Sequence, residues 1–342
     1  MIAAGASLAG SRVGASPAEL VHREGSLRLL RYRPAGRTAA PVAGAPPLLL
    51  VLPLINRGAI VDLTPSTSLV AALAARGVDT FVLDWGAPTL ADRTLGLDGY
   101  VGRLLPRCQT RALAAALAPR LVLAGYCLGG TLAAIRAALA SAAGEGQRER
   151  IAGLISLNAP VSFEDAGMLG AFAARERFPL EALLDAFANV PGALIQAGFH
   201  GLKPLQGVQK LRRLLHQAAD PRAVEEFLAL ELWNADNVDL TAAFYRTLIE
   251  DLHRDDRLVR GTLRVSDTTV DLAAIRCPTL VIAAEDDPIC LPAQARALLG
   301  LVSSAARSLV LTRGGHIRSV IGAGARERVA DAMAGFVRAC TP

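Results

Sequence analysis

The sequence is poor in cysteine, lysine and aromatic residues, and each shortage narrows what the protein can be. The five cysteines are odd in number and show no CxxC spacing, which argues against a disulfide framework and a zinc site. Only two lysines occur and the arginines are scattered, so the net charge of +5 indicates no nucleic-acid surface. No apolar run is long and uncharged enough to span a bilayer. We expect reduced thiols, a cytoplasmic location, no metal ion and no transmembrane segment.

Hydrophobic residues make up 52% of the 342 residues, enough for a substantial core in one large domain or one domain with an insertion. Apolar segments alternate with helix-forming ones, which predicts a mostly parallel sheet with helical crossovers. The predicted strands are 26–34, 48–52, 79–84, 120–124, 151–157, 279–283 and 307–311. A helix is predicted over 98–118, interrupted by Pro106. Residues before 21 show little pattern, and residues 1–10 lack the basic start of a signal peptide.

Residues 161–270 break the alternation and have the pattern of successive helices. The predicted helices there are 164–175, 180–187, 208–217, 222–232 and 241–251. We therefore expect a core formed by 1–160 and 271–342, and a helical cap formed by 161–270. A cap in this position would cover the carboxyl edge of the sheet, where open α/β sheets bind ligands. The alternative is that the insertion only enlarges the core.

The most informative stretch is the strand–turn–helix sequence around Cys127. Gly125-x-Cys127-x-Gly129 lies between an apolar run and a strong helix-forming segment. This is the nucleophile elbow of an α/β hydrolase, with cysteine in place of serine. The small flanking residues let strand and helix approach closely, and the helix N-terminus favours a thiolate at Cys127. The sequence therefore predicts the α/β-hydrolase fold with Cys127 as the nucleophile; the alternative is a buried core cysteine.

An elbow nucleophile needs a base and an orienting acid, which follow it in that fold in the order nucleophile, acid, base. His316 follows the last predicted strand in a glycine-rich loop and is the histidine of the C-terminal α/β part. His22, His200, His216 and His253 lie in the N-terminal segment or the insertion, and we expect surface or packing roles for them. Asp286 and Asp287 both follow the right strand. We choose Asp287 as the acid because an apolar branched residue follows it by two, and Asp286 stays an alternative.

The loop after the strand at 48–52 is expected to complete an oxyanion hole. In this fold one backbone N–H comes from the residue after the nucleophile, here Leu128, and the second from that loop. Ile55 or Asn56 would supply the second N–H; an ordinary turn at Asn56 is the alternative.

With these residues in hand, the chain resembles the polyhydroxyalkanoate synthase family nearly from end to end. The segments that carry the resemblance are Pro53-Leu-Ile-Asn-Arg57, Asp84-Trp-Gly86, Gly125-Tyr-Cys-Leu-Gly-Gly130, Leu232-Trp-Asn-Ala-Asp236 and Gly314-Gly-His-Ile317. Dienelactone hydrolases carry a near-identical cysteine box. The Asp-Trp-Gly and Trp-Asn-Ala-Asp motifs and the long insertion distinguish the two families.

The resemblance implies a poly(3-hydroxyalkanoate) synthase acting on 3-hydroxyacyl-CoA. His316 would take the Cys127 proton, Asp287 would hold the imidazole, and the thiolate would attack the thioester and release CoA. A substrate hydroxyl would then attack the acyl-enzyme. Trp233, in the insertion motif, is expected on the substrate side. No cofactor is implied, because the CoA thioester is itself the substrate.

The resemblance also implies partners and leaves other functions open. We expect a growing polyester chain or granule, a homodimer formed through the cap, and for the short synthase classes a second subunit. The second candidate is a cysteine hydrolase of esters, lactones or thioesters, which would use water where the synthase uses a hydroxyl. A third is a non-catalytic granule-surface protein.

Overall fold

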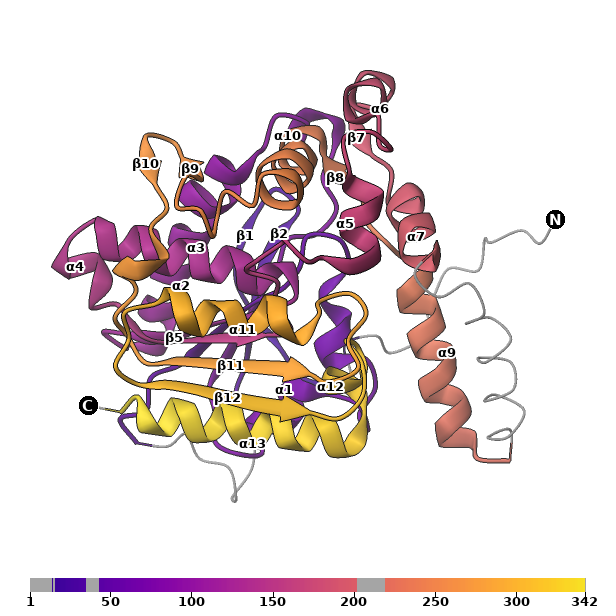
Figure 1. Cartoon of the computed structure of the whole chain (residues 1–342). Coiled ribbons are helices and arrows are strands. Elements are labelled where there is room, and N and C mark those ends of the chain that lie inside the picture. Colours follow the sequence, from indigo (N-terminus) through magenta and orange to yellow (C-terminus); the bar gives the residue numbers. More distant parts are fainter. Residues whose placement is uncertain (1–13, 15, 35–42, 202–218, 342) are drawn as a thin grey trace.

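An eight-stranded sheet forms the centre of the computed structural model, which describes residues 14, 16–34, 43–201 and 219–341 (Figure 1). The strand order is β1-β2-β4-β3-β5-β6-β11-β12. The strands are β1 (Glu19–Glu24), β2 (Leu27–Tyr32), β3 (Leu48–Val51), β4 (Thr80–Asp84), β5 (Leu121–Tyr126), β6 (Ile151–Leu157), β11 (Thr279–Ala284) and β12 (Arg307–Thr312). The pairs β1–β2 and β2–β4 are antiparallel, and the other pairs of this sheet are parallel. The prediction of a mostly parallel α/β sheet is confirmed.

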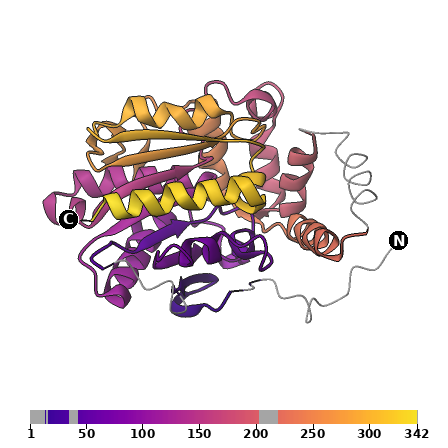
Figure 2. The same ribbon diagram turned by 90° about the horizontal axis from the view of Figure 1, so that it is seen from below.

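Helices cover both faces of the sheet, so the core has two layers (Figures 1 and 2). One layer joins the sheet to α2 (Leu105–Ala116), α3 (Leu128–Ala142) and α11 (Pro292–Leu301). The other joins it to α1 (Leu69–Ala74) and α13 (Ala323–Ala339). Strands buried on both faces need apolar residues at successive positions, which is why β3 to β6 and β11 have continuous apolar runs in the sequence.

The chain between β6 and β11 is mainly helical. It contains α5 (Gly167–Ala173), α6 (Leu180–Ala186), α7 (Gly192–Gly201), α9 (Pro221–Ala235), α10 (Ala242–Arg246) and η4 (Thr247–Arg254), with two short two-stranded ladders, β7–β8 (Asn189–Val190 with Leu240–Thr241) and β9–β10 (Arg264–Val265 with Thr268–Thr269). In Figure 1, α7 and α9 lie at the end of the molecule toward which β11 and β12 point. The predicted helix 208–217, with His216, lies outside the described residues, as do residues 1–13 and 15 of the N-terminal stretch that shows little pattern.

The structure refines two predictions about local structure. Glu19 and Leu20, where the sequence shows little pattern, begin the half-exposed edge strand β1, which has an irregular register between Leu20 and His22. The predicted helix 98–118 changes form beside Pro106: Asp98–Leu104 form the π-helix η3, and Pro106 lies in the first turn of α2, which follows directly.

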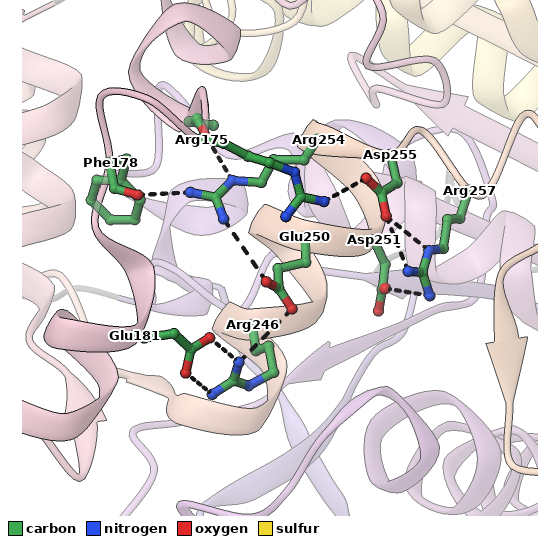
Figure 3. Close-up of polar contacts among 10 residues, drawn as sticks. Arg175, Phe178, Glu181, Arg246, Glu250, Asp251, Arg254, Asp255 and Arg257 are labelled. Atoms are coloured by element: carbon green, nitrogen blue, oxygen red, sulfur yellow. Dashed lines mark hydrogen bonds and ion pairs between the residues drawn. The ribbon is translucent and has the colours of Figure 1, made fainter.

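An ion-pair network ties the first cap helices to η4, itself a π-helix (Figure 3). The guanidinium of Arg254 is almost fully buried and donates to the carbonyl oxygens of Ala173 (2.9 Å) and Phe178 (2.7 Å). Arg175 pairs with Asp255 at 2.8 Å at the same turn. These contacts fix the chain between α5 and α6 against residues that lie 76 to 81 positions later in the sequence.

Candidate active site

Cys127 lies at a sharp turn between β5 and α3. Its φ of 54° and ψ of −135° form a conformation that non-glycine residues avoid, and its N–H donates to the carbonyl of Leu157 at 2.9 Å. A Cβ on Gly125 would come within 2.3 Å of the Gly129 carbonyl oxygen, so strand and helix can pack this closely only with glycine there. Cys127 is also the N-cap of a 15-residue helix, where the helix dipole favours a negative sulfur.

His316 and Asp287 come from two other loops at the same edge of the sheet. The Nδ1 atom of His316 lies 2.6 Å from Oδ2 of Asp287, and the Cys127 side chain is close enough to raise the pKa of the imidazole. The second oxygen of Asp287 accepts from the backbone N–H groups of Ile289 and Cys290, both at 2.9 Å. Asp286 is exposed, so of the two candidate acids the structure brings Asp287 to the imidazole.

The charges of this group determine where the proton resides. Burial alone lowers the pKa of His316. The negative charges of Cys127 and Asp287, and the hydrogen bonds to both, outweigh burial and raise that pKa to about 10. His316 therefore holds a proton at neutral pH. The buried carboxylate of Asp287 balances that positive charge and fixes the proton on Nδ1 toward itself.

The other four cysteines lack this environment. All five cysteines are free thiols. Burial raises the pKa of Cys108 and Cys277 to about 12 and of Cys340 to about 11, and it raises that of Cys290 well above the usual value. A protonated buried thiol is a poor nucleophile. Among the cysteines, the reactive position is therefore Cys127.

Three side chains that the sequence did not single out hold the backbone of His316. Its carbonyl oxygen accepts from Asn158 Nδ2 (3.0 Å), Ser319 Oγ (2.8 Å) and the Tyr126 hydroxyl (3.3 Å). Asn158 follows β6 directly and adopts a left-handed φ of 46°. Its Oδ1 accepts from the N–H of Ala284, at the end of β11. The sequence feature that could have pointed to Asn158 is its position at the carboxyl end of a central strand, beside Cys127.

The loop after β3 lies against the nucleophile. Ile55 and Asn56 line the cavity that contains Cys127, and Leu128 is the first residue of α3. Among the residues that the structure describes, none accepts a hydrogen bond from the backbone N–H of Ile55, Asn56 or Leu128. This placement is compatible with an oxyanion hole, and the choice between Ile55 and Asn56 stays a prediction.

The tryptophans of two sequence motifs, Asp-Trp-Gly and Trp-Asn-Ala-Asp, hydrogen-bond to the two ends of this loop. Trp85 donates its indole N–H to the carbonyl of Leu52 at 2.8 Å, just before the loop. Trp233, on α9, donates to the carbonyl of Arg57 at 2.9 Å, just after Asn56. Arg57 in turn pairs with Asp236 at 2.7 Å. Trp233 also lines the cavity that contains Cys127, while its indole N–H is engaged with the loop. A role of Trp233 in binding substrate stays a prediction.

Two cavities meet at Cys127. We call the first the triad cavity; it measures about 540 Å³, and its wall includes Tyr126, Cys127, Trp233 and His316. The second, the apolar cavity, measures about 460 Å³ and lies between the core and the cap helices. Both are lined by Ile55, Cys127, Phe199 and Ile289. A group attached to the sulfur can therefore extend toward the cap on a hydrocarbon wall.

Comparison with known proteins agrees with this geometry. The model of the alpha/beta hydrolase fold family matches residues 57–320. The poly(3-hydroxyalkanoate) polymerase subunit PhaC of Allochromatium vinosum is 33% identical over 324 residues, covering 94% of this chain and 88% of that protein. The chain belongs to the poly(3-hydroxyalkanoate) polymerase family. The poly(3-hydroxyalkanoate) polymerase subunit PhaC of Synechocystis is 32% identical to this chain over 293 residues, covering 84% of this chain and 75% of that protein.

Polymerases of this family differ in length. The polymerase subunit of Haloferax mediterranei is 32% identical over 89% of this chain, and the chain spans only 60% of that relative's length. Two solved structures share the fold. One is a soluble variant of the Saccharomyces cerevisiae monoglyceride lipase, with a TM-score of 0.58 and 13% identity, covering 97% of this chain and 98% of that one. The other is a Paleococcus ferrophilus monoacylglycerol lipase, with a TM-score of 0.55 and 13% identity, covering 92% of this chain and 99% of that one.

In the described ranges no group of three histidine, cysteine or acidic side chains could hold a metal ion. No helix there is both long and apolar enough to cross a bilayer.

Proposed function

We propose that this polymerase-family chain polymerises 3-hydroxyacyl-CoA through an acyl group carried on Cys127. The observation that carries the proposal is the Cys127–His316–Asp287 arrangement at the junction of two cavities, in a chain of this family. The proposed oxyanion hole consists of the backbone N–H groups of Leu128 and of Ile55 or Asn56. Trp233 lies on the substrate side of the site. No cofactor enters, because the thioester bond supplies the acyl group in activated form.

The first step loads the enzyme. The Cys127 thiolate attacks the thioester carbonyl, the carbon–sulfur bond to CoA breaks, and the proton on His316 leaves with the CoA thiol. One thioester replaces another, so the step is close to neutral in free energy. The backbone N–H groups of Leu128 and of Ile55 or Asn56 stabilise the oxyanion that forms on the carbonyl oxygen.

The second step forms the ester. The now neutral His316 takes the proton of a hydroxyl group from the next unit or the growing chain. The hydroxyl oxygen attacks the acyl carbon, and the bond to Cys127 Sγ breaks, which restores the thiolate and the imidazolium. Asp287 keeps the imidazole oriented in both steps. Water in place of the hydroxyl would give hydrolysis, and exclusion of water by the cap favours the polymer.

Analysis of the products tests this function. Incubation with 3-hydroxybutyryl-CoA should release CoA and yield oligomers of hydroxybutyrate by mass spectrometry, with a second polymerase subunit added in a parallel arm. Free hydroxybutyrate in equal amount to CoA, with no oligomer in either arm, would assign the chain to the cysteine hydrolases. Cys127→Ala is the control that should abolish CoA release.

We propose further that the chain acts as a homodimer, with a second subunit and a polymer granule as partners. Several relatives are named as polymerase subunits. Six of the ten exposed large apolar side chains of the described residues lie on or beside cap helices: Met168, Phe172, Phe187, Leu194, Leu228 and Leu232. Exposed large apolar side chains in this part of the chain support an association surface there. Sedimentation of a single species at the monomer mass of 35.7 kDa at micromolar concentration would contradict the dimer.

A further inference from the structure

His253 is one of the polar side chains in the wall of the apolar cavity, and the mechanism above does not use it. The wall of this cavity is formed largely by aromatic and aliphatic side chains, including Phe163, Phe172, Phe178 and Phe199. His253, on η4, is part of this wall and packs edge-on against Phe163, with 4.8 Å between ring centroids. Its Nδ1 atom is buried and has no hydrogen-bond partner among the described residues. Because Nδ1 is out of contact with the cavity, a group bound there would meet the ring at its other nitrogen, Nε2.

The surroundings keep this imidazole neutral and fixed. Burial lowers the pKa of His253 to about 4, so the ring is uncharged at neutral pH and can both donate and accept a hydrogen bond. The next residue, Arg254, is held by the carbonyls of Ala173 and Phe178, which line the same cavity. Because η4 is a π-helix, a form often found at functional sites, His253 and Arg254 project from a distorted turn.

The other polar side chains of the cavity are less available. Gln294 is part of the wall, but its amide donates to the Ser162 carbonyl and accepts from the Leu291 N–H. Arg177 is exposed. The Tyr245 hydroxyl is the remaining polar group, and it provides a control within the same cavity.

We propose that the apolar cavity receives the acyl chain bound to Cys127 and that His253 hydrogen-bonds its 3-hydroxyl group. This inference rests on the proposed function and adds a residue that selects hydroxylated over plain acyl groups. Cys127 lines the same cavity, so an acyl chain on its sulfur can enter there. The 3-hydroxyl is three bonds from the carbonyl carbon and enters with the first carbons of the chain. The apolar wall binds the hydrocarbon part, and the hydroxyl needs the polar partner that the imidazole offers.

The test compares acylation of Cys127 by 3-hydroxybutyryl-CoA and by butyryl-CoA, which lacks the hydroxyl. The quantity measured is the ratio of their second-order rate constants for CoA release in a single turnover. His253→Leu should lower this ratio about tenfold, mainly by slowing the hydroxylated substrate, because one hydrogen bond between neutral groups is lost. His253→Gln, which keeps a polar atom near the position of Nε2, should retain most of it.

Two further variants separate this role from a structural one. Tyr245→Phe removes the hydroxyl of the other polar side chain of this wall, and a larger fall in the ratio than His253→Leu gives would overturn the role of His253. His22→Leu alters a histidine on β1 outside both cavities and should leave the ratio unchanged. If His253→Leu fails to fold, His253→Phe carries the same test with a ring of similar shape. An unchanged ratio, or an equal loss for both substrates, overturns the role of His253. If the wild-type protein releases CoA from neither thioester, the result contradicts the proposed function itself, which distinguishes it from a failure of the role of His253 alone.

Discussion

Asp287 contributes two separate interactions to the site. One carboxylate oxygen binds the His316 imidazole and the other accepts two backbone N–H groups of its own loop. Asp287→Asn removes the charge and can present an N–H to Nδ1, which favours the wrong tautomer. We expect acylation of Cys127 to slow by about 10²-fold or more with the fold retained, measured as CoA release in a single turnover.

The neighbouring carboxylate is the matched control for this change. Asp286 is exposed and lies at the edge of the triad cavity. Asp286→Asn should change the rate of CoA release by less than about threefold, because solvent screens its charge. Equal losses in the two variants would contradict the assignment of the acid.

The raised pKa of His316 depends on the cysteine. Burial lowers this pKa, and the charge and hydrogen bond of Cys127 are among the contributions that overcome it. In the resting enzyme the imidazole should stay protonated from neutral pH until the pH rises through about 10. Cys127→Ala should lower this pKa, and nuclear magnetic resonance of labelled histidine checks the shift. An imidazole that titrates at the same pH in both proteins would contradict the ion pair.

The same group links stability to pH with a definite sign. The pKa of His316 in the fold exceeds the value of about 6.5 expected in an unfolded chain. Its contribution to the free energy of unfolding is therefore complete below that unfolded value and is lost as the pH rises through about 10.

At the level of residues, Cys127 and His316 could be named from the sequence because glycine leaves a visible pattern around each. For the acid that orients His316, the sequence left two adjacent candidates, Asp286 and Asp287. Both follow the same strand, and only the fold decides which one is buried. Asn158 was missed because its contacts reach β11 and the loop of His316, more than 120 residues away. His253 was expected to have a surface or packing role; its packing is confirmed, and its position in a cavity near the nucleophile could not be seen without the fold.

At the level of elements, the buried strands were predictable and the irregular ones were not. Central parallel strands leave continuous apolar runs, so the predicted 151–157 coincides with β6. The edge strand β1 is half-exposed and polar, and a π-helix such as η3 or η4 carries no distinctive residue pattern. The helical pattern of 241–251 was therefore right in kind, but it continues as η4 to Arg254 and changes form within the segment.

The contact between η4 and the α5–α6 turn is expected to stabilise the cap. Arg254→Met leaves two backbone carbonyls, those of Ala173 and Phe178, without their donor. We expect the free energy of unfolding to fall by about 2–4 kcal/mol in urea denaturation, with faster amide exchange in residues 173–178.

Arg246→Met provides the comparison for this change. Arg246 also belongs to the network and pairs with Glu181, but both side chains are largely exposed (Figure 3). Surface ion pairs contribute little, so the loss should be clearly smaller than for Arg254→Met. A larger effect from Arg246 than from Arg254 would show that the buried contacts do not hold the turn.

At the level of the whole molecule, a hydrolase core and a helical insertion form one site together. The core supplies Cys127, Asp287 and His316 from three loops at one edge of the sheet. The insertion supplies Trp233, which braces the loop of Ile55 and Asn56, and the cap wall of the apolar cavity. The sequence predicted that the insertion covers this edge, but not that it adds a second cavity, which depends on how α5, α7 and η4 pack.

The central claim is that the sulfur of Cys127 carries the acyl group, and trapping that group tests it most directly. The protein would be mixed briefly with 3-hydroxybutyryl-CoA, quenched in acid, digested and analysed by mass spectrometry. We predict a hydroxybutyryl adduct on the peptide that contains Cys127, stronger in His316→Gln if the second step needs the imidazole more than the first. An adduct on another cysteine, or CoA release without any adduct in either protein, would contradict the account.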